Sequence, residues 1–79
     1  MSDAFDTIRT EEERLLCRSY SRYPLAIVRG EGARLWDVDG REYVDLLAGI
    51  AVVGLGHCNP EVNAALEAQA RKLWHVSNL

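Results

Sequence analysis

Hydrophobic and polar positions alternate along the middle of the chain in the manner of short β-strands. Three such runs cover residues 26–29, 33–37 and 41–46. The residues between them, Gly30–Gly32 and the Asp39-Gly40 pair, favour tight turns with positive backbone dihedrals. Because turn chemistry and period-two alternation agree, the sequence predicts a three-stranded antiparallel meander.

Helix signals lie before this meander. Thr10 and Glu13 have the spacing of a capping box. They predict a short helix from Glu11 to about Ser19, preceded by a loose segment over residues 1–10.

A second helix is predicted after the meander. Asn59 followed by Pro60 combines a good N-cap with the residue favoured at the first helical position. Apolar residues then recur at helical spacing, including Val62, Leu66 and Leu73, so an amphipathic helix is expected from Pro60 to about residue 74.

The segment Leu47–Cys58 fits neither period. It carries Gly49, Gly54 and Gly56 among small aliphatic residues. Such a segment lets the backbone approach a ligand or another chain closely. This apolar segment and the apolar face of the helix expected over residues 60–74 both need other residues to bury them. The rest of the chain does not provide enough apolar surface for this. We therefore expect an α+β segment of a longer polypeptide.

Composition and charge exclude several classes of function. The 79 residues carry a net charge of -3 and no Lys/Arg cluster, which gives no support for nucleic acid or an anionic membrane as partner. The N-terminus lacks the apolar core of a signal peptide, and the run 46–55 is about half the length that spans a bilayer. Cys17 and Cys58 are expected to be free thiols, and the chain to be cytoplasmic.

Motifs for metals and phosphates are weak. The Gly30-x-Gly32 pair lacks the third glycine and the strand-to-helix context of a dinucleotide site. The acidic run around Asp37 and Asp39 has the wrong register for a calcium loop and is interpreted as a solvated hairpin turn. No Cys or His spacing is typical of zinc, so no metal site is predicted.

The remaining reactive side chains have ordinary explanations. His57 next to Cys58 lacks an orienting third group, so His57 is expected to fix a loop by hydrogen bonding. Lys72 is expected to be a surface cation near a helix C-terminus. Tyr20 and Tyr23 lie between helix and sheet, where an aromatic ring can form the wall of a binding site.

Several longer motifs carry a resemblance to a known family. The runs Arg29–Asp37 (RGEGARLWD) and Asp39–Asp45 (DGREYVD) resemble the N-terminal meander of class III aminotransferases. The stretches Gly49–Val52 (GIAV), Leu55–Pro60 (LGHCNP) and Leu73–Asn78 (LWHVSN) are similar to those of the acetylornithine group within it.

This resemblance implies an α/β fold-type-I transferase that binds pyridoxal 5'-phosphate and works as a homodimer or higher oligomer. The chain would be its N-terminal part: the small-domain meander, an interface loop and the start of the large domain. The implied reaction moves nitrogen from N-acetylornithine to 2-oxoglutarate, in arginine biosynthesis. The cofactor supplies the electron sink, and the protein supplies orientation and electrostatics.

The resemblance also implies roles for individual residues. Tyr20 matches a substrate-binding tyrosine, and Ile50, with Ala51 and Val52, matches the wall that selects the amino donor. The residues Gly54, Leu55, Gly56 and His57 match a loop at the subunit interface. The Schiff-base lysine and the other catalytic residues have no counterpart here, so no catalytic residue is predicted and the segment alone is expected to be inactive.

Two kinds of alternative remain open at the level of sequence. Within the same enzyme class, the alternative to N-acetylornithine is another amino donor, namely ornithine, succinylornithine or 4-aminobutyrate. The aliphatic side chain of Ile50 argues against an enzyme specialised for ornithine. Outside that class, the alternative is that the chain acts as a non-catalytic interaction module that binds a partner through its apolar face.

Overall fold

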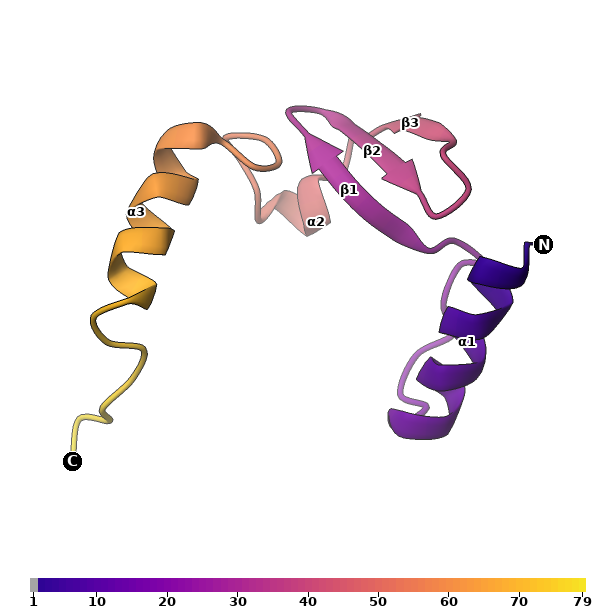
Figure 1. Ribbon diagram of the computed structural model, residues 1–79, viewed down its shortest axis with the longest axis horizontal. Coiled ribbons are helices and arrows are strands. Elements are labelled where there is room, and N and C mark those ends of the chain that lie inside the picture. Colours follow the sequence, from indigo (N-terminus) through magenta and orange to yellow (C-terminus); the bar gives the residue numbers. More distant parts are fainter. Residues whose placement is uncertain (1) are drawn as a thin grey trace.

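The computed structural model describes residues 2–79 and contains one small sheet with helical segments before and after it. In chain order the elements are α1 (Asp3–Leu15), β1 (Ile27–Glu31), β2 (Arg34–Asp37), β3 (Glu42–Val44), α2 (Ala48–Ala51) and α3 (Pro60–Ala70). The strands pair antiparallel in the order β1-β2-β3, which confirms the predicted meander and the α+β class. Helices α1 and α3 extend from opposite ends of the sheet (Figure 1).

Helix α1 begins earlier than the sequence predicted. The expectation of a loose segment before Glu11 is wrong for residues 2–10, and Met1 lies outside the described residues. The hydroxyl of Ser2 accepts the backbone N–H of Phe5 at 3.1 Å and caps the helix. Because this Ser cap precedes acidic residues in the first turn, it starts the helix before the later capping-box spacing can.

The same helix also ends earlier than predicted. It stops at Leu15 rather than near Ser19, because Leu16 has extended backbone dihedrals. Thr10 and Glu13, predicted to start the helix, lie inside it instead.

The hairpin between β1 and β2 is tighter than the sequence predicted. Gly30 pairs with Leu35 and Glu31 with Arg34, so both residues belong to the strand and the turn falls at Gly32-Ala33. The third strand is three residues long instead of the six predicted over 41–46.

Asp37 anchors the second hairpin from inside. Its side chain is 8% exposed, so the interpretation of a solvated turn is wrong at this residue, although the turn itself is confirmed. One carboxylate oxygen accepts the backbone N–H groups of Asp39 and Arg41, each at 2.9 Å, and the other accepts the Tyr43 hydroxyl at 2.7 Å. The Tyr43 hydrogen bond is the main cause that holds the pKa of Asp37 below its usual value, and the same bond raises the pKa of Tyr43.

Helix α3 starts where the sequence predicted. The side-chain oxygen of Asn59 accepts the backbone N–H groups of Glu61 at 3.0 Å and Val62 at 3.2 Å, ahead of Pro60 at the first helical position. The predicted end near residue 74 is wrong, because the helix ends at Ala70.

Apolar burial is sparse among residues 2–79. Phe5, at 7% exposed, is the single buried hydrophobic residue of this described range. Close backbone packing between elements of this range is confined to the three strands. The predicted stripe on α3 is uncovered: Val62 is 49% exposed and Leu66 is 64% exposed. The expected lack of apolar cover is therefore confirmed.

Candidate functional site

The loop between β3 and α3 is held closed at its base by two side chains. Asp45 Oδ2 lies 2.5 Å from His57 Nε2. Asp45 Oδ1 accepts the backbone N–H groups of Leu47 and Ala48, each at 2.9 Å. The contact with His57 is the first cause, and these two N–H groups the next, that hold the pKa of Asp45 below its usual value. The predicted role of His57, fixing a loop, is confirmed, with Asp45 as its partner.

The backbone at the end of this loop also joins the tip of the β1–β2 hairpin. Gly32 and His57 exchange both backbone hydrogen bonds, at 3.0 and 2.9 Å. Glycine is required for this close approach at two positions. A Cβ on Gly30 would lie 2.8 Å from the Cβ of His57, and a Cβ on Gly56 would lie 3.1 Å from the Cα of Gly32. The loop is therefore fixed to the sheet at His57.

Inside the closed loop, α2 is a single left-handed turn. Ala48, Gly49, Ile50 and Ala51 have φ values of 52°, 63°, 59° and 62°. Hydrogen bonds from Ala51 N–H and Val52 N–H to carbonyls four residues earlier close the turn. Left-handed helical backbone costs roughly 1–2 kcal/mol for each residue with a side chain. Such strain persists only where surrounding contacts impose it, and it is concentrated at functional sites.

The strained turn presents apolar side chains outward. Ile50 is 88% exposed and Val52 is 78% exposed, and Leu55 farther along the loop is 73% exposed. An exposed aliphatic surface on a backbone that is fixed at its base is suited to contact with an apolar ligand group or another chain. The predicted residues Ile50 and Ala51 therefore lie on this turn, and Val52 follows it directly.

The predicted loop Gly54–His57 divides into two parts. Gly54 and Leu55 are exposed, whereas Gly56 and His57 lie against the β1–β2 hairpin. The four residues therefore contribute to the site in different ways. Gly54 and Leu55 form part of its surface, and Gly56 and His57 attach the loop to the β1–β2 hairpin.

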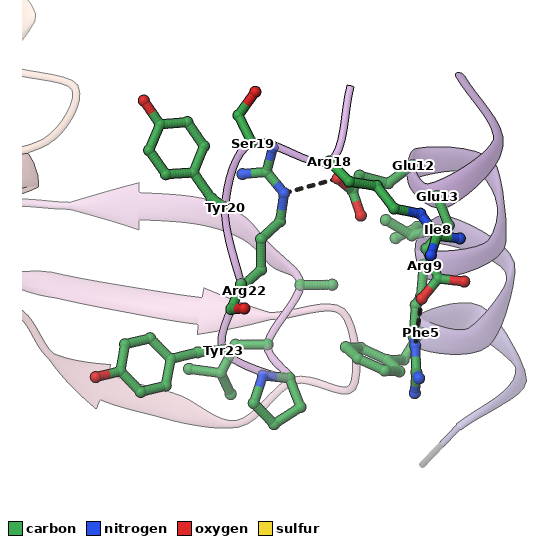
Figure 2. A pocket seen from close by; sticks show the side chains of 14 residues that line it. Phe5, Ile8, Arg9, Glu12, Glu13, Arg18, Ser19, Tyr20, Arg22 and Tyr23 are labelled. Atoms are coloured by element: carbon green, nitrogen blue, oxygen red, sulfur yellow. Dashed lines mark hydrogen bonds and ion pairs between the residues drawn. The ribbon is translucent and has the colours of Figure 1, made fainter. Parts of the chain in front are cut away.

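Tyr20 occupies a separate part of the structure. It lies in the segment between α1 and β1, beside a recess of about 590 Å³ that this segment forms with α1. Figure 2 shows the rings of Tyr20 and Tyr23 pointing away from α1. Both rings are exposed, at 77% and 86%. The segment between α1 and β1 lies beside α1, whereas α2 lies toward the other end of the sheet (Figure 1).

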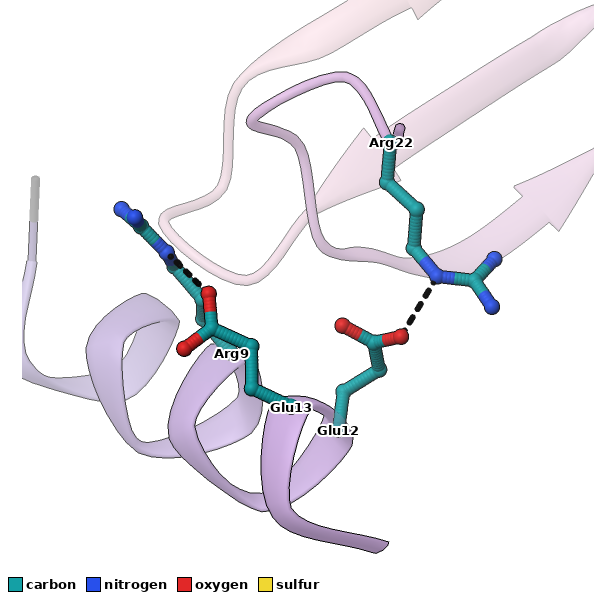
Figure 3. Close-up of polar contacts among 4 residues, drawn as sticks. All are labelled: Arg9, Glu12, Glu13 and Arg22. Atoms are coloured by element: carbon teal, nitrogen blue, oxygen red, sulfur yellow. Dashed lines mark hydrogen bonds and ion pairs between the residues drawn. The ribbon is translucent and has the colours of Figure 1, made fainter. Parts of the chain in front are cut away.

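Ion pairs connect α1 to the tyrosine segment and stabilise α1 itself. Arg22 Nε lies 2.7 Å from Glu12 Oε1, across the recess, and Arg9 Nε lies 3.1 Å from Glu13 Oε1 on the same helix; both contacts can be followed in Figure 3. All four side chains are at least partly exposed, so each pair contributes at most about 1 kcal/mol. The Arg22–Glu12 pair therefore orients the tyrosine segment more than it stabilises the fold.

A Schiff-base lysine and a metal site each place requirements on the described residues. Lys72, the only lysine, is exposed just beyond α3. A Schiff-base lysine needs a buried site or a neighbouring cation that lowers its pKa. No cluster of His, Cys, Asp or Glu in this range could hold a metal ion. Cys17 and Cys58 are free and exposed. The described part of the chain has no helix with the length and apolarity needed to cross a membrane.

Sequence reasoning missed Asp45 as part of this site. The available signal was an Asp directly after a strand and before a glycine-containing apolar run, where its carboxylate can accept N–H groups two and three residues later. The sequence does not indicate that Asp45 contacts His57, because the two residues are 12 positions apart and no local pattern connects them.

The profile of the family described as "Aminotransferase class-III" matches residues 16–79. The chain belongs to the class III aminotransferase family. The acetylornithine aminotransferase of Myxococcus xanthus is 53% identical over 74 residues, which are 94% of this chain and 18% of that protein.

Solved structures of class III aminotransferases share this fold. The acetylornithine aminotransferase from Elizabethkingia anophelis matches with a TM-score of 0.87 at 34% identity, over 98% of this chain and 19% of that one. An ornithine aminotransferase from Toxoplasma gondii, whose structure reveals partial occupancy of PLP at its active site, matches with a TM-score of 0.81 at 40% identity, over 87% of this chain and 16% of that one. The chain therefore spans less than a fifth of these relatives and is an α+β segment of their fold.

Proposed function

We propose that these residues are the N-terminal part of an acetylornithine aminotransferase. The whole enzyme transfers the side-chain amine of N-acetylornithine to 2-oxoglutarate and yields N-acetylglutamate 5-semialdehyde and glutamate. It acts in the cytoplasm, in arginine biosynthesis. The support is the similarity to acetylornithine aminotransferases, at 53% identity to the Myxococcus protein over 94% of this chain and 62% identity to the Rhodobacter capsulatus protein over 77% of it.

The segment contributes substrate contacts and an interface to this enzyme. Ile50, Ala51 and Val52 form a wall against the amino donor, and Tyr20 binds the substrate from another side. Gly54 and Leu55 face the second subunit of a homodimer. Support for these roles comes from the exposure of the apolar side chains on a loop that is fixed at its base.

Pyridoxal phosphate supplies the electron sink for nitrogen transfer when it is bound by the whole enzyme. Since Lys72 is exposed, we propose that the cofactor is held by residues outside this segment. The segment alone would not transaminate.

The observation that carries the donor assignment is the aliphatic side chain of Ile50, displayed on the strained turn. An aliphatic wall leaves room for the acetylated tail of the donor without offering a hydroxyl to the free amine of ornithine. One apolar contact of this kind discriminates substrates by about 10- to 200-fold.

Turnover of competing donors tests this proposal. Full-length enzyme that carries these residues would be purified with its cofactor and assayed with 2-oxoglutarate. N-acetylornithine, N-succinylornithine, ornithine and 4-aminobutyrate would be compared by kcat/KM. We expect N-acetylornithine to be preferred over ornithine and 4-aminobutyrate by at least about 10-fold. Equal values, or a preference for ornithine, would contradict the donor assignment.

A further inference from the structure

We propose that Asp45 and His57 are positioning residues that force the α2 turn into its left-handed conformation and thereby set the direction of Ile50. This inference rests on the proposed function for its kinetic consequence but not for its structural one. The pair itself does not touch substrate in this scheme. It acts through the backbone of the turn.

The left-handed turn α2 needs contacts from outside itself to hold its conformation. Ala48, Ile50 and Ala51 adopt positive φ values that residues with side chains rarely accept, and Ile50 is in addition β-branched. The turn's own hydrogen bonds close one coil but do not select its hand. A right-handed coil of the same length forms equivalent bonds without the clash of Cβ with backbone. The hand must therefore come from contacts at the ends of the loop.

Those contacts converge on one carboxylate. Asp45 accepts the N–H groups of Leu47 and Ala48, the residues at which the chain changes direction to begin the turn. Its second oxygen contacts His57, which is bonded to Gly32 on the hairpin. The start and the end of the loop are therefore joined through one side-chain pair, with Asp45 only 9% exposed.

The hand of the turn decides the direction of the Ile50 side chain. Ile50 lies in the middle of the left-handed coil and is 88% exposed. A change of hand over residues 48–51 would redirect its side chain while leaving the loop attached at Gly32 and His57. Since misplacement by about 1 Å can lower a rate about 100-fold, the hand of this coil would set how well the amino donor is held.

The structural arm of the test does not depend on the donor. Crystal structures of the full-length enzyme would be compared for the wild type, His57→Ala and His57→Gln. Gln places an amide N–H at the same number of bonds from the backbone as His Nε2, so it can still donate to Asp45. We expect positive φ at Ala48, Ile50 and Ala51 in the wild type and His57→Gln, and loss of that conformation in His57→Ala. A left-handed turn that persists in His57→Ala would overturn the proposal.

The kinetic arm separates positioning from a general loss of stability. We expect His57→Ala to lower kcat/KM for the preferred amino donor by about 10- to 100-fold, and His57→Gln to restore most of it. In an Ile50→Ala background the same His57→Ala change should have little further effect, because the two residues act through one contact. Additive losses in this double-mutant cycle would overturn the proposal.

A milder variant covers the case in which His57→Ala does not fold. Asp45→Asn keeps an oxygen that can accept both backbone N–H groups, whereas Asp45→Ser is too short to join the turn to His57. We expect the turn and the donor kinetics to survive Asp45→Asn better than Asp45→Ser, and equal effects would count against the proposal. If the wild type proves to prefer a different donor, the proposed function fails while the φ values still decide the role of the pair.

Discussion

At the scale of single residues, the chain uses two aspartates as hydrogen-bond acceptors that organise the turns around them. Asp37 holds the second hairpin and Asp45 holds the α2 loop, and each accepts two backbone N–H groups together with one contact from a side chain. A carboxylate suits this task because it offers several acceptor sites on two oxygens. Both have lowered pKa values for this reason.

The Asp37–Tyr43 bond makes stability depend on pH in a defined way. Because the pKa of Asp37 is lowered, its contribution is present above about pH 4 and is lost as the pH falls through the lowered value. Because the pKa of Tyr43 is raised, its contribution is present below about pH 10 and is lost as the pH rises through the raised value.

We expect Tyr43→Phe to destabilise the full-length enzyme at pH 7 and to reduce the loss of stability between about pH 5 and pH 3. Free energies of unfolding measured across this pH range would check it. Tyr23→Phe is the matched control, since the Tyr23 ring is 86% exposed and should leave the profile unchanged. Identical pH profiles for wild type and Tyr43→Phe would show that the bond does not contribute.

Glycine at position 30 is required by packing. Gly30→Ala would place a Cβ 2.8 Å from His57, so we expect a destabilisation of about 1–3 kcal/mol and a displaced loop. Glu31→Ala is the control, because this neighbouring residue of β1 is exposed and its substitution should change stability by no more than about 0.5 kcal/mol. Chemical denaturation of both variants measures the difference. Equal stabilities would mean that the loop does not pack on the hairpin as described.

At the scale of elements, local signals decided what could be predicted. The start of α3 was predictable because Asn59 and Pro60 act within one turn of each other. The start of α1 was missed because Ser2 offers an equally good cap eight residues before Thr10. The left-handed α2 turn was not predictable from local signals, since residues with side chains such as Ile50 locally favour other conformations.

The cap of α3 provides a prediction at this scale. Asn59→Ala removes the acceptor for the N–H groups of Glu61 and Val62, and we expect a loss of about 1 kcal/mol. Asn59→Asp keeps the acceptor and places negative charge at the helix N-terminus, so its stability should match the wild type. Thermal unfolding of the two variants distinguishes them. A stable Asn59→Ala variant would show that Pro60 alone sets the start of α3.

At the scale of the whole molecule, the chain exposes most of its apolar side chains. One hydrophobic residue is buried within residues 2–79, and close backbone packing between elements there is confined to the three strands. The class III relatives are more than five times longer, which gives a source of cover for the α2 turn and the α3 stripe. The resemblance in sequence predicted that the chain is part of a longer aminotransferase. The periodicity of apolar residues alone predicted only an α+β segment whose apolar face lacks cover.

This exposure predicts how the isolated segment behaves. We expect the 79-residue chain alone to bind a hydrophobic dye such as ANS and to lack a cooperative unfolding transition. The same residues within the full-length enzyme should be protected from hydrogen exchange at α2 and α3. A cooperative, monomeric transition of the isolated chain would contradict the account of its missing cover.

The central claim is that the α2 turn forms part of the amino-donor site, and substitution of Ile50 tests it most directly. A tyrosine at this position fills the space of the acetylated tail and adds a hydroxyl. The measurement is the ratio of kcat/KM for N-acetylornithine to that for ornithine, in the full-length wild type and Ile50→Tyr. We predict that the substitution lowers this ratio by about 10- to 200-fold. An unchanged ratio would contradict the claim.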